Sequence, residues 1–127
     1  MIDCSKTAVE SRRRARRETL QAELDRMMAL LRGHEGVRRV VLFGSLAEGN
    51  AGSRSDLDIA IVQDTDKRFL DRLKEIYDLL KPRVEADVLV YTPAEWEDLR
   101  VSRAFIRRIA ERGVVLYERA PEPAARA

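Results

Sequence analysis

Two short apolar segments and the polar stretch between them constrain the fold of this chain most strongly. Residues 37–43 end in Val-Val-Leu-Phe, which is apolar on both faces, as a strand in a sheet covered on both sides requires. Residues 56–62 form a second predicted strand. A short helical segment over 45–49 and a loop over 50–55, rich in Gly and Ser, connect the two strands. These features favour a sheet with helices packed against it.

The rest of the chain alternates between helical and strand patterns. Apolar residues recur at spacings of three and four over 7–32 and over 64–81, which predicts two helices. Residues 84–91 form a third predicted strand, and the capping box that begins at Thr92 starts one broken or two short helices before a short strand over 114–117. The alternation predicts a small α/β domain. The helix over 64–81 is expected to bury Phe69, Leu70, Leu73, Ile76, Tyr77 and Leu80.

Length and composition favour a single domain. The chain has 127 residues, of which 45% are hydrophobic, and this suits one core. We expect an N-terminal basic helix over 1–36, a core over 37–118 and a flexible tail over 119–127. Cys4 is the only cysteine, which excludes an internal disulfide and a Cys-rich zinc site. No apolar run approaches the roughly 20 residues that span a bilayer, and no signal peptide is recognised, so we expect a cytoplasmic protein without a membrane segment.

Five arginines lie between Arg12 and Arg17. A basic block of this kind could contact nucleic acid, an acidic partner or a phosphorylated ligand. The alternative interpretation is the solvated start of a helix.

Acidic residues on the predicted strands suggest a metal site. Asp56 and Asp58 are expected to project from the same face of their strand, because side chains alternate along a strand. Two adjacent carboxylates are electrostatically unfavourable unless a cation lies between them, so this pair can hold one Mg²⁺ or two ions bridged by a shared oxygen. If the second and third strands are neighbours, Asp87 is the preferred third ligand and Glu85 the alternative.

Gly44 and Ser45 follow the first strand directly. Backbone N–H groups and a hydroxyl at such a position suit phosphate oxygens. An isolated Gly-Ser pair or Asp-x-Asp motif indicates only a turn, but their combination points to a site for a nucleoside triphosphate with Mg²⁺.

Gly44-Ser45, then ten residues, then Asp56-Leu57-Asp58, followed by an acidic residue on a later strand, resembles the DNA polymerase beta-type nucleotidyltransferase superfamily. The chain is most similar to its minimal nucleotidyltransferases, which are often paired with a HEPN-domain protein. The resemblance is strong over residues 37–91. It implies an α/β (α+β) fold in which helices pack on a small mixed β-sheet, with a polymerase beta-like core.

The resemblance also implies a reaction and a set of site residues. A nucleoside monophosphate, AMP from ATP or the equivalent from another NTP, would pass to an acceptor hydroxyl with release of pyrophosphate. Asp56 and Asp58 would bind both of two Mg²⁺ ions, and Asp87 the ion that activates the acceptor. The nucleotide-binding residues would be Gly44 and Ser45, which hold the β- and γ-phosphates, together with Arg54 and Ser55.

One position departs from the family pattern. Many relatives carry an arginine where Glu48 stands, and Arg54 is the nearby residue that could substitute for it in binding the triphosphate. This departure concerns nucleotide affinity rather than the metal site.

The resemblance implies a partner as well. The expected role is an antitoxin that neutralises a HEPN-family ribonuclease toxin by binding it, by adding AMP to a tyrosine on it, or both. The chain has no sizeable second domain, so its acceptor surface is expected to come from a partner or a second copy; nucleic acid is a less favoured partner. The alternatives are a non-catalytic module that binds a nucleotide or a partner, and a stand-alone transferase acting on a small hydroxylated molecule.

Overall fold

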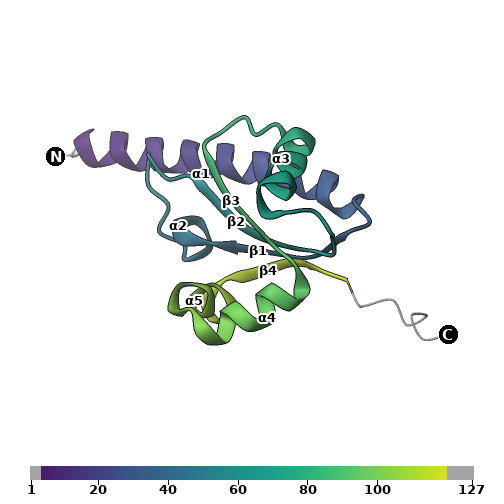
Figure 1. Ribbon diagram of the computed structural model, residues 1–127. Helices are drawn as coiled ribbons and strands as arrows, with labels where there is room; N and C mark the ends of the chain where they lie inside the picture. Colours follow the sequence, from purple (N-terminus) through teal and green to yellow (C-terminus); the bar gives the residue numbers. More distant parts are fainter. Residues whose placement is uncertain (1–3, 120–127) are drawn as a thin grey trace.

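The computed structural model describes residues 4–119. Helices cover both faces of one β-sheet (Figure 1). In chain order the elements are α1 (Cys4–Arg32), β1 (Val37–Phe43), α2 (Gly44–Ala47), β2 (Leu57–Gln63), α3 (Phe69–Leu80), β3 (Ala86–Tyr91), α4 (Pro93–Ser102), α5 (Ala104–Arg112) and β4 (Val114–Glu118).

The sheet is mixed and has four strands in the order β3-β2-β1-β4. β1 pairs antiparallel with both β2 and β4, whereas β2 and β3 are parallel. The parallel pair needs a crossover connection, which α3 provides. The expectation of a small mixed sheet with helices packed on it is therefore confirmed.

Alternation along the strands divides the core into two layers. Leu57, Ile59 and Ile61 of β2 face α1 and α3, where they join the larger apolar cluster. Ala60 and Val62 point the other way, toward α4 and α5. Figure 1 shows these two helix pairs on opposite sides of the sheet. β2 is largely buried on both faces, so a charged side chain such as that of Asp58 is unusual within it.

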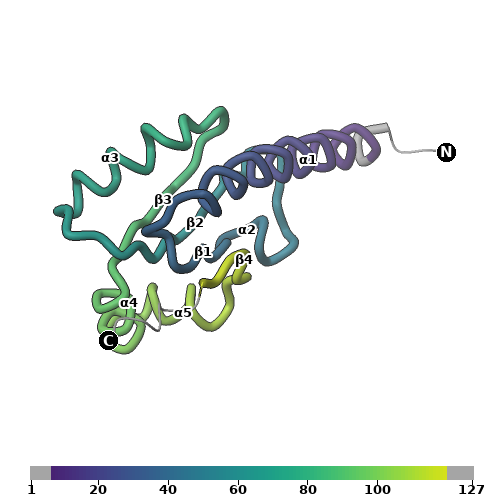
Figure 2. The backbone as a smooth tube through the Cα atoms, turned by 90° about the vertical axis from the view of Figure 1, so that its right-hand side faces the viewer, coloured from purple at the N-terminus to yellow at the C-terminus, as the bar shows by residue number. Residues whose placement is uncertain are grey.

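The N-terminal half of α1 projects beyond the body of the protein (Figure 2). Leu20 is its first buried side chain. Arg12, Arg13 and Arg14 are exposed, as the solvated-helix interpretation of the basic block expects. No helix in the part of the chain that the structure describes is both long enough and apolar enough to cross a membrane.

The prediction of a helix over 64–81 is wrong at its start and in its buried face. α3 begins only at Phe69, because Thr65 Oγ1 accepts a hydrogen bond from the backbone N–H of Lys67 and turns the chain. Ile76 and Leu80 are buried as expected, but Phe69, Leu70 and Tyr77 are exposed.

Arg72 takes a buried position on α3 that the apolar pattern did not predict. Its side chain is 8% exposed and forms an ion pair with Glu95 of α4 at 2.6 Å (Nη1 to Oε1). This pair joins the helix on one side of the sheet to a helix on the other.

The C-terminal predictions agree more closely with the structure. Thr92 caps α4 through the predicted capping box, because its hydroxyl accepts from the N–H of Glu95 while the Glu95 carboxylate accepts from the N–H of Thr92. Two short helices follow, and then β4. Of the predicted tail over 119–127, all but residue 119 lies outside the described residues.

Candidate active site

Asp58 and Asp87 lie side by side on adjacent strands. The parallel register of β2 and β3 pairs Asp58 directly with Asp87, and the antiparallel register of β1 and β2 pairs Asp58 with Phe43. The end of β1 and the starts of β2 and β3 therefore meet at one edge of the sheet. Glu85, the alternative third acid, lies before β3; its carbonyl accepts from the N–H of Leu57, and its side chain is exposed.

Gly44 lies against the Asp58 carboxylate. Its φ of +77° belongs to the left-handed region, and a Cβ added at this position would overlap Asp58 Oδ2 and lie 3.0 Å from Asp58 Cγ. Glycine is therefore required twice, by the backbone conformation and by the close approach of the carboxylate. The glycine of the Gly-Ser motif and the second aspartate of the Asp-x-Asp motif form one structural unit.

Ser45 and Ser55 close the loop between β1 and β2. Ser45 Oγ donates a hydrogen bond to Ser55 Oγ at 2.9 Å, and the backbone N–H of Gly52 donates to the same oxygen at 2.8 Å. These bonds hold the ten-residue spacer in a compact form between the two motifs. Ser55 thus has a structural role in shaping the loop.

The pKa of Asp58 is raised to about 6. Burial of the carboxylate is the largest cause, and the neighbouring Asp87 and then Asp56 add to it. A half-buried carboxyl group beside a second, exposed one favours either a shared proton or a cation between them.

Asp56 lies just before β2, not within it as predicted, and its carboxylate is drawn toward α1. Arg16 Nη2 lies 3.9 Å from Asp56 Oδ1, and Arg16 Nε donates to the carbonyl of Ser55 at 2.9 Å. Among the described residues, no group of three or more His, Cys, Asp or Glu side chains is arranged to hold a metal ion. The three predicted aspartates are close in the fold, but only Asp58 and Asp87 form a pair.

A cavity of about 370 Å³ opens at this edge of the sheet. One wall carries the acidic residues Glu48, Asp58 and Asp87, and the opposite wall is a face of α5. Arg54, predicted to bind nucleotide, does not line this cavity and is exposed on the loop. The α5 residues that line the cavity are Phe105, Arg108, Ile109 and Arg112.

The sequence motifs gave no indication that α5 reaches this cavity. Phe105 makes an edge-to-face contact with Phe43 (ring centroids 6.0 Å apart, planes at 85°), which fixes α5 beside the residue that precedes Gly44. The only signal is the helical spacing of residues 105, 108, 109 and 112, which places them on one face. That spacing does not reveal which element the face will oppose.

Comparisons with known proteins identify the family of this chain. Residues 25–115 match the family model of the nucleotidyltransferase domain. The chain belongs to the nucleotidyltransferase-domain family. It is 33% identical over 84 residues to a protein of Methanocaldococcus jannaschii named "Putative protein adenylyltransferase MJ0604". The aligned segment covers 64% of this chain and 79% of that protein. The expectation of a nucleotidyltransferase enzyme is confirmed at this level.

Two solved structures align with this chain. The crystal structure of a "putative nucleotidyltransferase" from Sulfolobus solfataricus aligns with a TM-score of 0.63 at 19% identity, covering 85% of this chain and 88% of that one. This match supports the fold. A structure of the toxin-antitoxin MntA-HpeT with the Y104A mutation aligns with a TM-score of 0.48 at 20% identity, covering 75% of this chain and 72% of that one.

The residues at this edge of the sheet have the chemistry to hold a divalent cation. Carboxylate oxygens are the preferred ligands of Mg²⁺, and Asp58 and Asp87 place two carboxylates together where their charges repel. A cation between them would relieve that repulsion. Asp56 directly precedes β2, with its Oδ1 directed toward Arg16.

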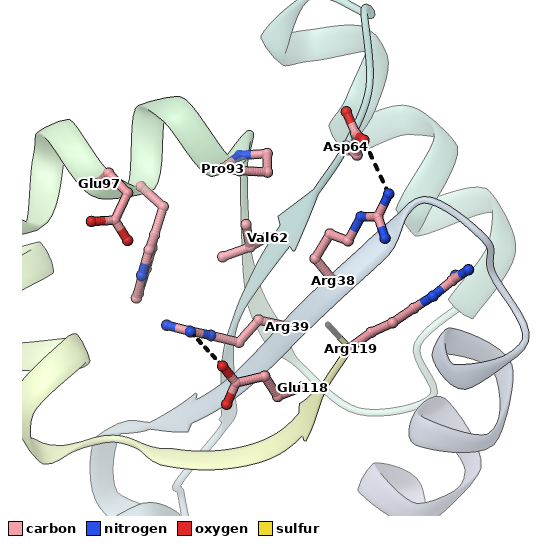
Figure 3. Close-up of a pocket in the computed structure, with 9 residues that line it drawn as sticks. Arg38, Arg39, Val62, Asp64, Pro93, Glu97, Glu118 and Arg119 are labelled. Atoms are coloured by element: carbon pink, nitrogen blue, oxygen red, sulfur yellow. Dashed lines mark hydrogen bonds and ion pairs between the residues drawn. The ribbon is translucent and has the colours of Figure 1, made fainter. Parts of the chain in front are cut away.

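A second cavity, of about 330 Å³, lies on the same side of the sheet, between the strands and α4 (Figure 3). Two of its arginines form ion pairs, Arg39 with Glu118 at 2.7 Å and Arg38 with Asp64 at 3.2 Å. The third, Arg119, donates from Nη1 to the carbonyl of Glu35 at 2.7 Å. It has neither the glycine nor the paired aspartates of the nucleotidyltransferase motif. The cavity beside α5 is therefore the candidate active site.

Proposed function

We propose that the protein is a Mg²⁺-dependent nucleotidyltransferase that moves AMP from ATP to an acceptor hydroxyl. The observation that carries this proposal is the Asp58–Asp87 pair, set against Gly44 at the mouth of a cavity of about 370 Å³. A cavity of this size is within the range that encloses a small ligand. The protein adenylyltransferase named among the relatives supports AMP as the transferred group.

Each residue of the motif has a task in this proposal. Asp58, Asp87 and Asp56 would hold the metal ions. Gly44 leaves room for the Asp58 carboxylate, and the backbone N–H groups of Gly44 and Ser45 would donate to phosphate oxygens. When bound, Mg²⁺ would neutralise charge on the triphosphate and lower the pKa of the acceptor hydroxyl. The protein then contributes mainly positioning and electrostatic stabilisation.

We propose further that the acceptor lies on a partner protein and that the chain serves as the antitoxin of a HEPN-family toxin. The motif resemblance supports this role. The exposed arginines at the projecting end of α1 are a candidate surface for an acidic patch on that partner. Reversing the charges of Arg12 and Arg13 should weaken the complex most at low salt, and an unchanged affinity would leave this segment as a solvated helix.

A non-catalytic binding module is the second candidate. The contact between Arg16 and Asp56 favours it, because the arginine already offsets part of the negative charge that a metal ion would neutralise. Glu48 in the cavity points the same way, since it adds negative charge where a triphosphate would bind.

Transfer of label separates the two candidates. The protein is incubated with Mg²⁺ and a HEPN-domain partner, in one sample with ATP labelled at the α-phosphate and in a second with ATP labelled at the γ-phosphate. Transfer of AMP predicts that the partner retains the α-label and not the γ-label, which leaves with pyrophosphate. A partner that binds but acquires no label, together with no Mg²⁺-dependent binding of ATP, would support the binding module.

A further inference from the structure

The cavity beside α5 has walls of opposite charge. Glu48, Asp58 and Asp87 lie on the side of the sheet and α2, and Arg108 and Arg112 lie on α5 across from them. Within residues 4–119, neither arginine forms an ion pair or a hydrogen bond through its side chain. These two exposed cations therefore line the cavity without an ion-pair partner among the described residues.

The position of the two arginines is set by packing. Arg108 and Arg112 are four residues apart on α5, so they share a face of the helix. Ile109 on that face is buried, and Phe105 contacts Phe43, so the face is held toward the end of β1. Arg107, the neighbour of Arg108, lies outside the cavity lining, and its Nη2 donates to the carbonyl of Val101 at 3.0 Å.

A metal-bound polyphosphate is complementary to such a cavity. Its cation would meet the carboxylates, and its remaining anionic oxygens would meet guanidinium groups, which suit phosphate oxygens by charge and by their fixed fork of donors. The loop between β1 and β2 supplies no cation at this place, because Glu48 lines the cavity and Arg54 does not reach it.

We propose that Arg108 and Arg112 of α5 bind the phosphate oxygens of the nucleoside triphosphate. This inference rests on the proposed function, since it names further residues that bind the same substrate. It assigns substrate binding to a helix outside the Gly-Ser and Asp-x-Asp motifs.

Inorganic tripolyphosphate tests the proposal, because it carries no nucleoside and cannot serve as a donor of AMP. Its binding is measured by calorimetry, with and without Mg²⁺, for the wild type and for the variants Arg108→Gln, Arg112→Gln and Arg107→Gln. Loss of a charged hydrogen bond predicts about tenfold or greater weakening for each cavity variant. Arg107→Gln is the matched control on the same helix and should bind as the wild type does.

Substitution by lysine separates charge from folding. Arg112→Lys keeps the positive charge and should recover part of the affinity that Arg112→Gln loses, while melting temperatures report whether α5 remains folded. Equal affinity in all variants, equal weakening by Arg107→Gln, or no binding by the wild type would overturn the proposal. Absence of AMP transfer from ATP alongside the expected tripolyphosphate pattern would instead count against the proposed function alone.

Discussion

Asp58 of β2 is paired in parallel register with Asp87 of β3, and partial burial of the Asp58 carboxyl group, together with the neighbouring Asp87, raises the pKa of Asp58 to about 6. The ionised form of Asp58 is therefore disfavoured in the folded protein relative to the unfolded chain. The energetic cost is absent below the ordinary pKa of 3.8 and is complete once the pH exceeds about 6. This relationship ties stability, pH and metal binding together.

Asp58→Asn should stabilise the metal-free protein above about pH 6. The substitution removes the carboxylate charge and leaves a shape of similar size, so we expect a gain of about 1 kcal/mol in the free energy of unfolding at about pH 7.5, after allowance for screening by solvent. The gain should vanish at about pH 4, where the wild-type carboxyl is mostly protonated. Denaturant unfolding at both pH values, in the presence of a chelator, measures the difference.

Added Mg²⁺ should act in the opposite direction on these two proteins. A cation that binds the native carboxylates raises the melting temperature of the wild type but not that of Asp58→Asn. Equal shifts in both proteins would place the bound ion away from this pair.

Gly44→Ala should disrupt the site. The new Cβ overlaps the Asp58 carboxylate and occupies a backbone conformation that alanine rarely adopts, so the substitution should cost about 1–3 kcal/mol of stability. It should also displace Asp58 and weaken Mg²⁺ binding. Gly52→Ala is the control in the same loop, because a Cβ there has no heavy atom within 4 Å. Two variants of equal stability and Mg²⁺ affinity would contradict the close packing of Gly44 on Asp58.

The ion pair between Arg72 and Glu95 should contribute measurably to stability. Glu95→Gln keeps an acceptor for the capping box but leaves the buried Arg72 guanidinium without its counter-charge, so we expect a loss of about 1–2 kcal/mol. Glu97→Gln on the same helix alters only an exposed pair with Arg100 and should leave the unfolding free energy nearly unchanged. Thermal or denaturant unfolding of both variants shows whether the Arg72–Glu95 ion pair stabilises the fold.

Glu23 should make the protein sensitive to acid. Hydrogen bonds from the Arg26 side chain, opposed by burial and aided by the backbone N–H of Arg83, lower the pKa of Glu23 from 4.5 to about 2. A lowered pKa means that the carboxylate stabilises the fold fully above pH 4.5 and loses this effect as the pH falls through about 2. Glu23→Gln should therefore cost about 2 kcal/mol at neutral pH and progressively less below about pH 4, as measured by urea unfolding across that range.

The order of elements could be predicted from the sequence because local signals agree with the fold. The apolar end of β1, the alternation in β2 and the capping box at Thr92 each depend on neighbouring residues only, and the structure confirms them. The start of α3 was wrong because one side-chain hydrogen bond from Lys67 to Thr65 overrides a helical pattern.

The site could be predicted only as far as its residues belong to the sheet. Alternation and the order of the strands bring Asp58 and Asp87 together, but Asp56 lies outside β2, and its partner Arg16 is 40 positions earlier in the sequence. The facing arginines of α5 were missed for a related reason, since helical spacing defines a face but not its neighbour. Long-range packing decides both contacts.

The Asp58–Asp87 pair is the central claim, and the rate of AMP transfer tests it most directly. Transfer from α-labelled ATP to the partner is compared for the wild type, Asp58→Asn, Asp87→Asn and Glu85→Gln under saturating Mg²⁺. Loss of a ligand should slow Asp58→Asn and Asp87→Asn by about a hundredfold or more, while Glu85→Gln, exposed before β3, retains the wild-type rate. Wild-type rates in the two aspartate variants, or loss of activity in Glu85→Gln alone, would contradict the account.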